Sequence, residues 1–208
     1  MEHKNNDIKN AVIYIHGKGG SPAEAEHYRQ LFDGYDIFGF DYSSDTPWKA
    51  ADEFGSYFDT INNDHDEIII IANSIGAHFA LHSLNDKNIK EAFFISPVVD
   101  MEKLISDMMS WAGVTEDELR EKGEIKTAFG ETLSWKYLCW VRNTPVKWDI
   151  PTTVLYGEKD ELQSFTSIKS FAEKTRSEII VMKNGEHWFH TEEQMQFLKD
   201  NIKEKMKY

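Results

Sequence analysis

Six short runs of β-branched and aromatic residues recur along the chain, and longer stretches with helical spacing separate them. The apolar character of each run is continuous rather than alternating, which is typical of strands that are covered on both faces of a parallel sheet. We therefore predict strands at residues 11–15, 36–40, 67–72, 92–95, 152–156 and 178–182.

The segments between the predicted strands carry signals for the start of a helix. Ser21 is followed by Pro22 and then by Glu24, which is the pattern of a capping box with proline at the first helical position. Thr191 and Gln194 repeat the capping pattern before the last helix. Strand–helix alternation of this kind implies right-handed crossovers. The predicted fold class is α/β, a doubly wound, mainly parallel sheet of about six strands in a single domain over residues 1–208.

One segment, residues 100–149, breaks this alternation. It contains no recognisable strand, yet it is too long to be a single crossover helix. Thr115 and Glu118 have capping-box spacing, which predicts a helix within it. Four of the six tryptophans fall here, namely Trp111, Trp135, Trp140 and Trp148. We predict a helical cap insertion folded over the sheet, with an ordinary pair of core-packed helices as the alternative.

The net charge of −13 limits the classes of partner. Binding to nucleic acid needs clustered lysine and arginine, and docking on an anionic membrane by charge needs the same. We therefore expect neither nucleic acid nor a membrane as a partner, and we interpret the acidity as a contribution to solubility. The sequence leaves the oligomeric state open.

The cysteine content and the apolar runs indicate a reducing, aqueous compartment. Cys139 is the single cysteine, so an intrachain disulfide and a cysteine-rich metal site are both excluded. We expect it to pack in the aromatic segment WKYLCWV. Residues 1–10 are polar and lack the apolar core of a signal peptide. The longest apolar runs are too short to span a bilayer. We therefore expect a cytoplasmic protein.

A serine follows the most apolar predicted strand, in the segment EIIIIANSIGAHFA. The strand ends at Asn73 and Ser74, and a helix of small and apolar residues begins at once. A sharp strand-to-helix turn of this kind lifts the serine hydroxyl above the sheet. It also points the N–H of Ile75, at a helix N-terminus, toward an oxyanion formed on the serine. The alternative is that Ser74 is only a helix cap.

A glycine-rich turn, HGKGGSP, follows the first predicted strand. Its backbone N–H groups can face a cleft, and the N–H of Lys18 or Gly19 is the expected second oxyanion donor. His16 is expected to support this turn through hydrogen bonds. A phosphate-binding loop is the alternative, but neither GxGxxG nor a P-loop GK[ST] is present.

Acidic residues follow the fifth predicted strand, in the segment TTVLYGEKDEL. A carboxylate in this loop can reach an imidazole across the carboxyl edge of the sheet. Asp160 is the favoured candidate for that role. The alternatives are Glu158, Asp100 after the fourth strand, and Glu161.

Two histidines, His187 and His190, follow the last predicted strand. A histidine in this loop is well placed to act as a general base toward Ser74. His187 is favoured because it directly follows the turn at Gly185, whereas His190 adjoins the start of the last helix. His78 and His82 lie one helical turn apart after Ser74, which suits a metal, but no HExxH pattern or third ligand accompanies them.

At these residues the chain resembles the α/β-hydrolase superfamily, in particular its small members, over nearly its whole length. The order Ser74, Asp160, His187 is the chain order of that superfamily. The resemblance implies that Ser74 is the nucleophile, Asp160 the acid and His187 the base, with the N–H groups of Lys18 and Ile75 forming the oxyanion hole. Two departures are Ala72, where glycine is usual, and the absence of the leading antiparallel strands.

The resemblance implies acyl transfer from an ester or thioester through an acyl-enzyme, with no metal or organic cofactor. The expected partner is a small, apolar ester-type substrate, because the cap is rich in aromatic residues. The residues expected to line the substrate pocket are Trp135, Tyr137, Trp140 and Trp188. The alternatives are a peptidase or C–C bond hydrolase on the same residues, a non-catalytic binding protein, and a flavodoxin-like nucleotide-binding protein, which the glycine turn disfavours.

Overall fold

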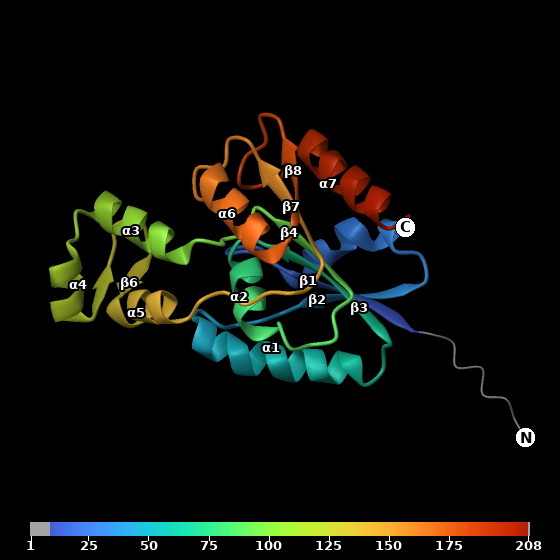
Figure 1. Cartoon of the computed structure of the whole chain (residues 1–208), viewed down its shortest axis with the longest axis horizontal. Helices are drawn as coiled ribbons and strands as arrows, with labels where there is room; N and C mark the ends of the chain where they lie inside the picture. Colours follow the sequence, from blue (N-terminus) through green and yellow to red (C-terminus); the bar gives the residue numbers. More distant parts are fainter. Residues whose placement is uncertain (1–8, 208) are drawn as a thin grey trace, which may run out of the picture.

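The computed structural model describes residues 9–207, and most of the segment interpreted above as lacking a signal peptide lies outside them. A six-stranded sheet forms the centre of the molecule, in the order β2-β1-β3-β4-β7-β8, with every neighbouring pair parallel (Figure 1). The strands are β1 (Asn10–Ile15), β2 (Tyr35–Phe40), β3 (Glu67–Asn73), β4 (Glu91–Ile95), β7 (Thr152–Gly157) and β8 (Glu178–Met182). The predicted α/β class and parallel sheet are confirmed.

Helices cover both faces of this sheet and form two separate layers of the core. One layer contains α1 (Pro47–Asn62), α2 (Ile75–Ser83) and α6 (Phe165–Thr175), and the other contains the 3₁₀ helix η1 (Pro22–Leu31) and α7 (Glu192–Lys205). Alternate residues of one strand serve the two layers, as Ile70 and Ile71 of β3 do. Continuous apolar strands are the consequence of this two-sided burial.

The chain reverses its direction across the sheet between β1 and β3. β1 leads outward to β2, after which β3 pairs with the other edge of β1 and the chain continues through β4 and β7 to β8. The helical segments that follow β1 and β3, η1 and α2, lie on opposite faces. In open α/β sheets, ligands bind beside the carboxyl ends of the strands at such a switch point.

Gly76 allows α2 to start directly above the end of β1. A Cβ atom added at this position would lie 2.4 Å from the carbonyl oxygen of His16 and 2.9 Å from the side chain of Ile15. No side chain fits in that space without moving the main chain. This close approach holds the end of β3 against the end of β1.

A compact module is inserted between β4 and β7 and lies to one side of the sheet (Figure 1). It consists of α3 (Met101–Ala112), α4 (Glu116–Lys122), β5 (Glu124–Lys126), β6 (Thr132–Ser134) and α5 (Trp135–Asn143). We call residues 101–143 the cap. Met101, Ile105, Leu119, Leu133 and Leu138 give it a small hydrophobic core of its own.

Two features of residues 100–149 differ from the sequence-based predictions. The segment contains a two-stranded antiparallel hairpin, β5–β6, where no strand was expected. Each of its strands has three residues with one apolar side chain, which is too short for a recognisable pattern. Trp148 does not belong to the cap, because it is 2% exposed against the sheet. Its ring packs 5.3 Å from that of Phe94, and its Nε1 donates to Thr152 at 2.7 Å.

None of the helices within residues 9–207 is both long enough and apolar enough to cross a membrane.

We predict that Gly76→Ala lowers the free energy of unfolding by about 1–3 kcal/mol, because the new methyl group meets a main-chain carbonyl. Urea denaturation measures the change. Gly55→Ala is the matched control, since an added Cβ at this helical position comes no closer than 4.0 Å to Lys87 Nζ. It should raise stability by up to about 1 kcal/mol, because alanine is the better helix former. Equal effects of both substitutions would contradict the proposed close packing.

Candidate active site

The backbone of Ser74 is held in a strained conformation at the junction of β3 and α2. Its φ and ψ angles are 51° and −116°, a region that costs a non-glycine residue on the order of 1–3 kcal/mol. Hydrogen bonds fix both sides of the residue. Its N–H donates to Ile95 O at 3.0 Å, and its carbonyl accepts from Val98 N at 3.1 Å. The side chain makes no helix-capping bond, so the hydroxyl is free for another partner.

That partner is His187, in the loop between β8 and α7. Ser74 Oγ lies 2.8 Å from His187 Nε2, and His187 Nδ1 lies 2.8 Å from Asp160 Oδ2. A carboxylate can only accept, so Nδ1 carries the proton and Nε2 accepts from the serine hydroxyl. The structure therefore brings together the three residues named from the sequence, and we call this set of bonds the Ser74–His187–Asp160 relay.

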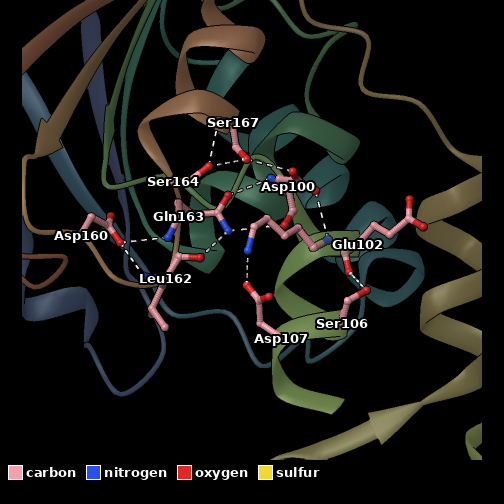
Figure 2. Close-up of polar contacts among 10 residues, drawn as sticks. Asp100, Glu102, Ser106, Asp107, Asp160, Leu162, Gln163, Ser164 and Ser167 are labelled. Carbon is pink, nitrogen blue, oxygen red and sulfur yellow. Dashed lines mark hydrogen bonds and ion pairs between the residues drawn. The ribbon is translucent and has the colours of Figure 1, made fainter. Parts of the chain in front are cut away.

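The Asp160 carboxylate is buried and fully bonded. Its side chain is 0% exposed, whereas that of His187 is 18% exposed. Oδ1 accepts from the N–H groups of Leu162 at 2.8 Å and Gln163 at 3.0 Å (Figure 2). These two bonds occupy one oxygen and leave the other directed at His187. Hydrogen bonds to a carboxylate are among the stronger ones in proteins, so the orientation is well defined.

The loops that carry Asp160 and His187 are in direct contact. Lys159 N donates to Gly185 O at 2.7 Å. A Cβ atom at Gly157 would lie only 2.5 Å from Glu186 O. The main chains of the two loops therefore pass each other without room for a side chain. This contact sets the separation between Asp160 and His187.

The glycine turn after β1 lies beside Ser74. A Cβ atom at Gly17 would be 3.1 Å from Ser74 Cβ. Tyr42 steadies the turn, because its hydroxyl donates to His16 O at 2.8 Å and its ring stacks on the imidazole at 4.4 Å. Within residues 9–207, the backbone N–H groups of Lys18 and Ile75 donate to no other group. Both are therefore free to donate to a bound ligand.

The other candidates for the acid and the base have different partners. Asp100 caps α3 by accepting from Lys103 N at 3.1 Å, and Glu158 accepts from Asn184 N at 2.9 Å. His190 is exposed, and its Nδ1 lies 2.7 Å from Trp188 O. Glu161 is exposed as well. The structure does not join any of them to Ser74.

The four aromatic residues predicted to contact substrate are in three different settings. Tyr137 and Trp140 of the cap face the core helices, with ring centroids 6.2 Å from His78 and 4.7 Å from His82 respectively. Trp135 packs within the cap, where Arg120 lies over its ring. Trp188 is 68% exposed and stacks on His190.

One aromatic residue of this region was missed from the sequence. Trp48, in the first turn of α1, packs against Tyr137 at 5.8 Å and against Trp140 at 6.3 Å. It is far from the cap in the chain, and a tryptophan at a helix start gives no local signal of such a contact. The cap therefore meets the core through an aromatic cluster formed by Trp48, Tyr137 and Trp140.

The two histidines of α2 lie against this cluster, His78 buried and His82 half-buried. Burial lowers the pKa of His78 to about 3, with a smaller contribution from His82, and burial lowers the pKa of His82 to about 4. Over the described residues 9–207, the His, Cys, Asp and Glu side chains form no group of three or more suited to a metal ion. The two imidazoles therefore act as neutral rings in the packing between cap and core.

Comparisons with known proteins show the fold. No protein-family model matches the chain, and no curated protein matches it. Among solved structures, Est1E from Butyrivibrio proteoclasticus is 17% identical, with a TM-score of 0.74 over 97% of this chain and 88% of that one. Another structure of Est1E contains ferulic acid. The Pyrococcus furiosus esterase Pf2001 is 19% identical, with a TM-score of 0.65 over 98% and 83% of the two chains. The chain therefore has the α/β-hydrolase fold.

We predict that acid weakens the fold through His78. Its pKa is lower in the folded chain than in the unfolded chain, so below pH 6.5 only the unfolded chain takes up the proton and stability falls with falling pH. For one such histidine the loss between about pH 7 and about pH 5 is roughly 2 kcal/mol. Urea denaturation at both pH values measures it.

His78→Phe should reduce this loss, because the ring remains and the titrating group is gone. His27→Phe is the matched control at an exposed position, and it should keep the pH dependence of the wild type. An unchanged pH dependence in His78→Phe would show that His78 titrates normally in the folded chain.

Proposed function

We propose that this protein is a serine hydrolase that cleaves a carboxylic ester or thioester of a small, apolar substrate through an acyl-enzyme on Ser74. The observation that carries the proposal is the relay, in which Ser74 Oγ, His187 and Asp160 are joined by two contacts of 2.8 Å. A strained turn presents the serine, and a buried carboxylate orients the histidine. These are the parts required to activate a hydroxyl as a nucleophile.

In the first step, His187 Nε2 takes the proton of Ser74 as Oγ attacks the carbonyl carbon of the substrate. The carbonyl oxygen becomes an oxyanion, which the N–H groups of Lys18 and Ile75 stabilise. Asp160 stabilises the imidazolium that forms. When the tetrahedral intermediate collapses, His187 donates its proton to the departing alkoxide or thiolate, and the acyl group remains on Ser74 as an ester.

In the second step, water replaces the leaving group. His187 takes a proton from the water molecule, the oxygen attacks the acyl carbon, and the proton passes to Ser74 Oγ as the acid leaves. Each transfer uses a side chain or an N–H group of this chain, so the proposed mechanism requires no metal or organic cofactor.

The cap supports an apolar substrate. Ile75, the residue after the nucleophile, packs against both the sheet core and the cap core. The aromatic cluster lies on the same side, where the cap meets α2. An apolar or aromatic acyl group suits such surroundings. The structural likeness to Est1E, which has been solved with ferulic acid, adds an aromatic acid to the acyl groups worth testing.

The alternative from another functional class is a binding protein without turnover. The 2.8 Å contact between Ser74 and His187 favours a hydrolase over it.

We predict that a fluorophosphonate probe forms one adduct, on Ser74. Mass mapping of the labelled protein locates it. Ser96 is the internal comparison, because it also follows a buried strand with positive φ, but it should remain unlabelled. Ser74→Ala should abolish both labelling and ester turnover, whereas Ser96→Ala should keep both. Labelling elsewhere, or turnover by Ser74→Ala, would refute the proposal.

The acid is tested separately, by the hydrolysis rates of p-nitrophenyl esters of increasing acyl length and of methyl ferulate. We predict that Asp160→Asn lowers kcat by about 10⁴-fold, because the amide stabilises the wrong tautomer of His187. Glu158→Gln is the matched control. It changes a carboxylate of the same loop that accepts from Asn184 N at 2.9 Å. It should leave kcat within about twofold. The reverse ranking of the two variants would assign the acid to Glu158.

A further inference from the structure

Gln163 is a buried side chain in which every polar atom has a partner. It is 1% exposed. Its Oε1 accepts from Asp100 N at 2.9 Å, and its Nε2 donates to Leu162 O at 2.9 Å and to Asp100 O at 3.4 Å (Figure 2). Oε1 also accepts from Val99 N at 3.0 Å. A buried amide with this many backbone partners has a single orientation.

These partners belong to two segments far apart in the chain. Residues 97–100, which we call the strap, lead from the end of β4 to the first residue of the cap. Residues 160–163 form the loop that carries Asp160. The Gln163 amide joins the two, and Ser167 Oγ adds a bond to Asp100 Oδ2 at 2.9 Å. The other side of the strap is bonded to the nucleophile, because Val98 N donates to Ser74 O at 3.1 Å.

The backbone of Gln163 is bonded directly to Asp160. Its N–H donates to Asp160 Oδ1 at 3.0 Å, and its carbonyl accepts from the Tyr156 hydroxyl at 2.9 Å. Fixing the Gln163 side chain therefore fixes the N–H that determines which carboxylate oxygen faces His187. If the amide is lost, two half-buried N–H groups of the strap lose their acceptor, and the loop loses its anchor.

We propose that Gln163 is a positioning residue that ties the loop of Asp160 to the strap, so that the orientation of the acid and the seating of the cap are set together. The inference rests on the proposed function, since it assigns Gln163 an effect on turnover that acts through Asp160. A misplacement of the acid by a fraction of an ångström is sufficient for such an effect, because proton transfer depends steeply on geometry.

The test uses two substitutions of the full chain. Gln163→Met keeps the length of the side chain and removes all four bonds, whereas Gln163→Glu keeps the acceptor for Val99 N and Asp100 N. We expect Gln163→Met to lower kcat for a p-nitrophenyl ester by about 10- to 100-fold. We expect KM to change by less than about threefold. Gln163→Glu should recover a large part of the loss.

A double-mutant cycle with Asp160→Asn separates positioning from stability. If Gln163 acts through Asp160, Gln163→Met should lower the kcat of Asp160→Asn by less than about threefold. If the Met variant does not fold, as judged by circular dichroism, Gln163→Glu is carried through the same cycle. Thr152→Val is the control for lost stability, since it removes the bond from Trp148 Nε1 at the amino end of β7, away from the relay. It should keep kcat within about twofold.

Wild-type kcat in both Gln163 variants would overturn the inference, as would a loss of full size in the Asp160→Asn background. An equal fall of kcat in Thr152→Val would overturn it too, because the effect would then follow stability alone. Failure of the proposed function has a different signature. In that case the wild-type protein neither reacts with the fluorophosphonate at Ser74 nor turns over the ester, and the inference falls with it.

Discussion

The strained backbone of Ser74 is the constraint on which the rest of the site depends. A residue with φ of 51° at this position persists only because its neighbours over-determine it. Ile95 O and Val98 N bond to its main chain, and Gly76 lets α2 pass within contact of His16. The same contacts bring the glycine turn and the strap to Ser74. The strain and the assembly of the site therefore have one structural cause.

The positions of Asp160 and Asp100 show how similar residues acquire different roles. Both follow a buried strand, and both accept hydrogen bonds from main-chain N–H groups two or three residues further along the chain. The carboxylate of Asp100 is engaged by Lys103 N and Ser167 Oγ, at the start of the cap. That of Asp160 keeps one oxygen for His187. The two carboxylates differ in where the second oxygen points, toward His187 for Asp160 and toward Ser167 for Asp100.

The sequence predicts the sheet and the relay well because their signals are local. Continuous apolar strands mark a two-sided sheet, and Ser74, Asp160 and His187 each follow such a strand at one edge. The hairpin β5–β6 is not predicted because each of its strands has only three residues, too few to show a periodic pattern of apolar side chains. The burial of Trp148, the contact of Trp48 with the cap and the bonds of Gln163 escape it for another reason. Each depends on a contact with residues that are distant in the chain, or on the path that a loop takes back to the sheet. The residues next to them in the sequence give no sign of either.

The cap has a hydrophobic core of its own and meets the remainder of the protein at few places. The strap holds the start of α3, and the aromatic cluster joins α5 to α1 and α2. Glu131, in the turn of the hairpin, pairs with Lys18 of the glycine turn. The cap and the Ser74–His187–Asp160 relay therefore belong to units with separate hydrophobic cores. Residues inside the cap can therefore change without moving Ser74, His187 or Asp160. Asp100, Gln163 and the tip of the hairpin, by contrast, are the contacts that any changed cap has to preserve.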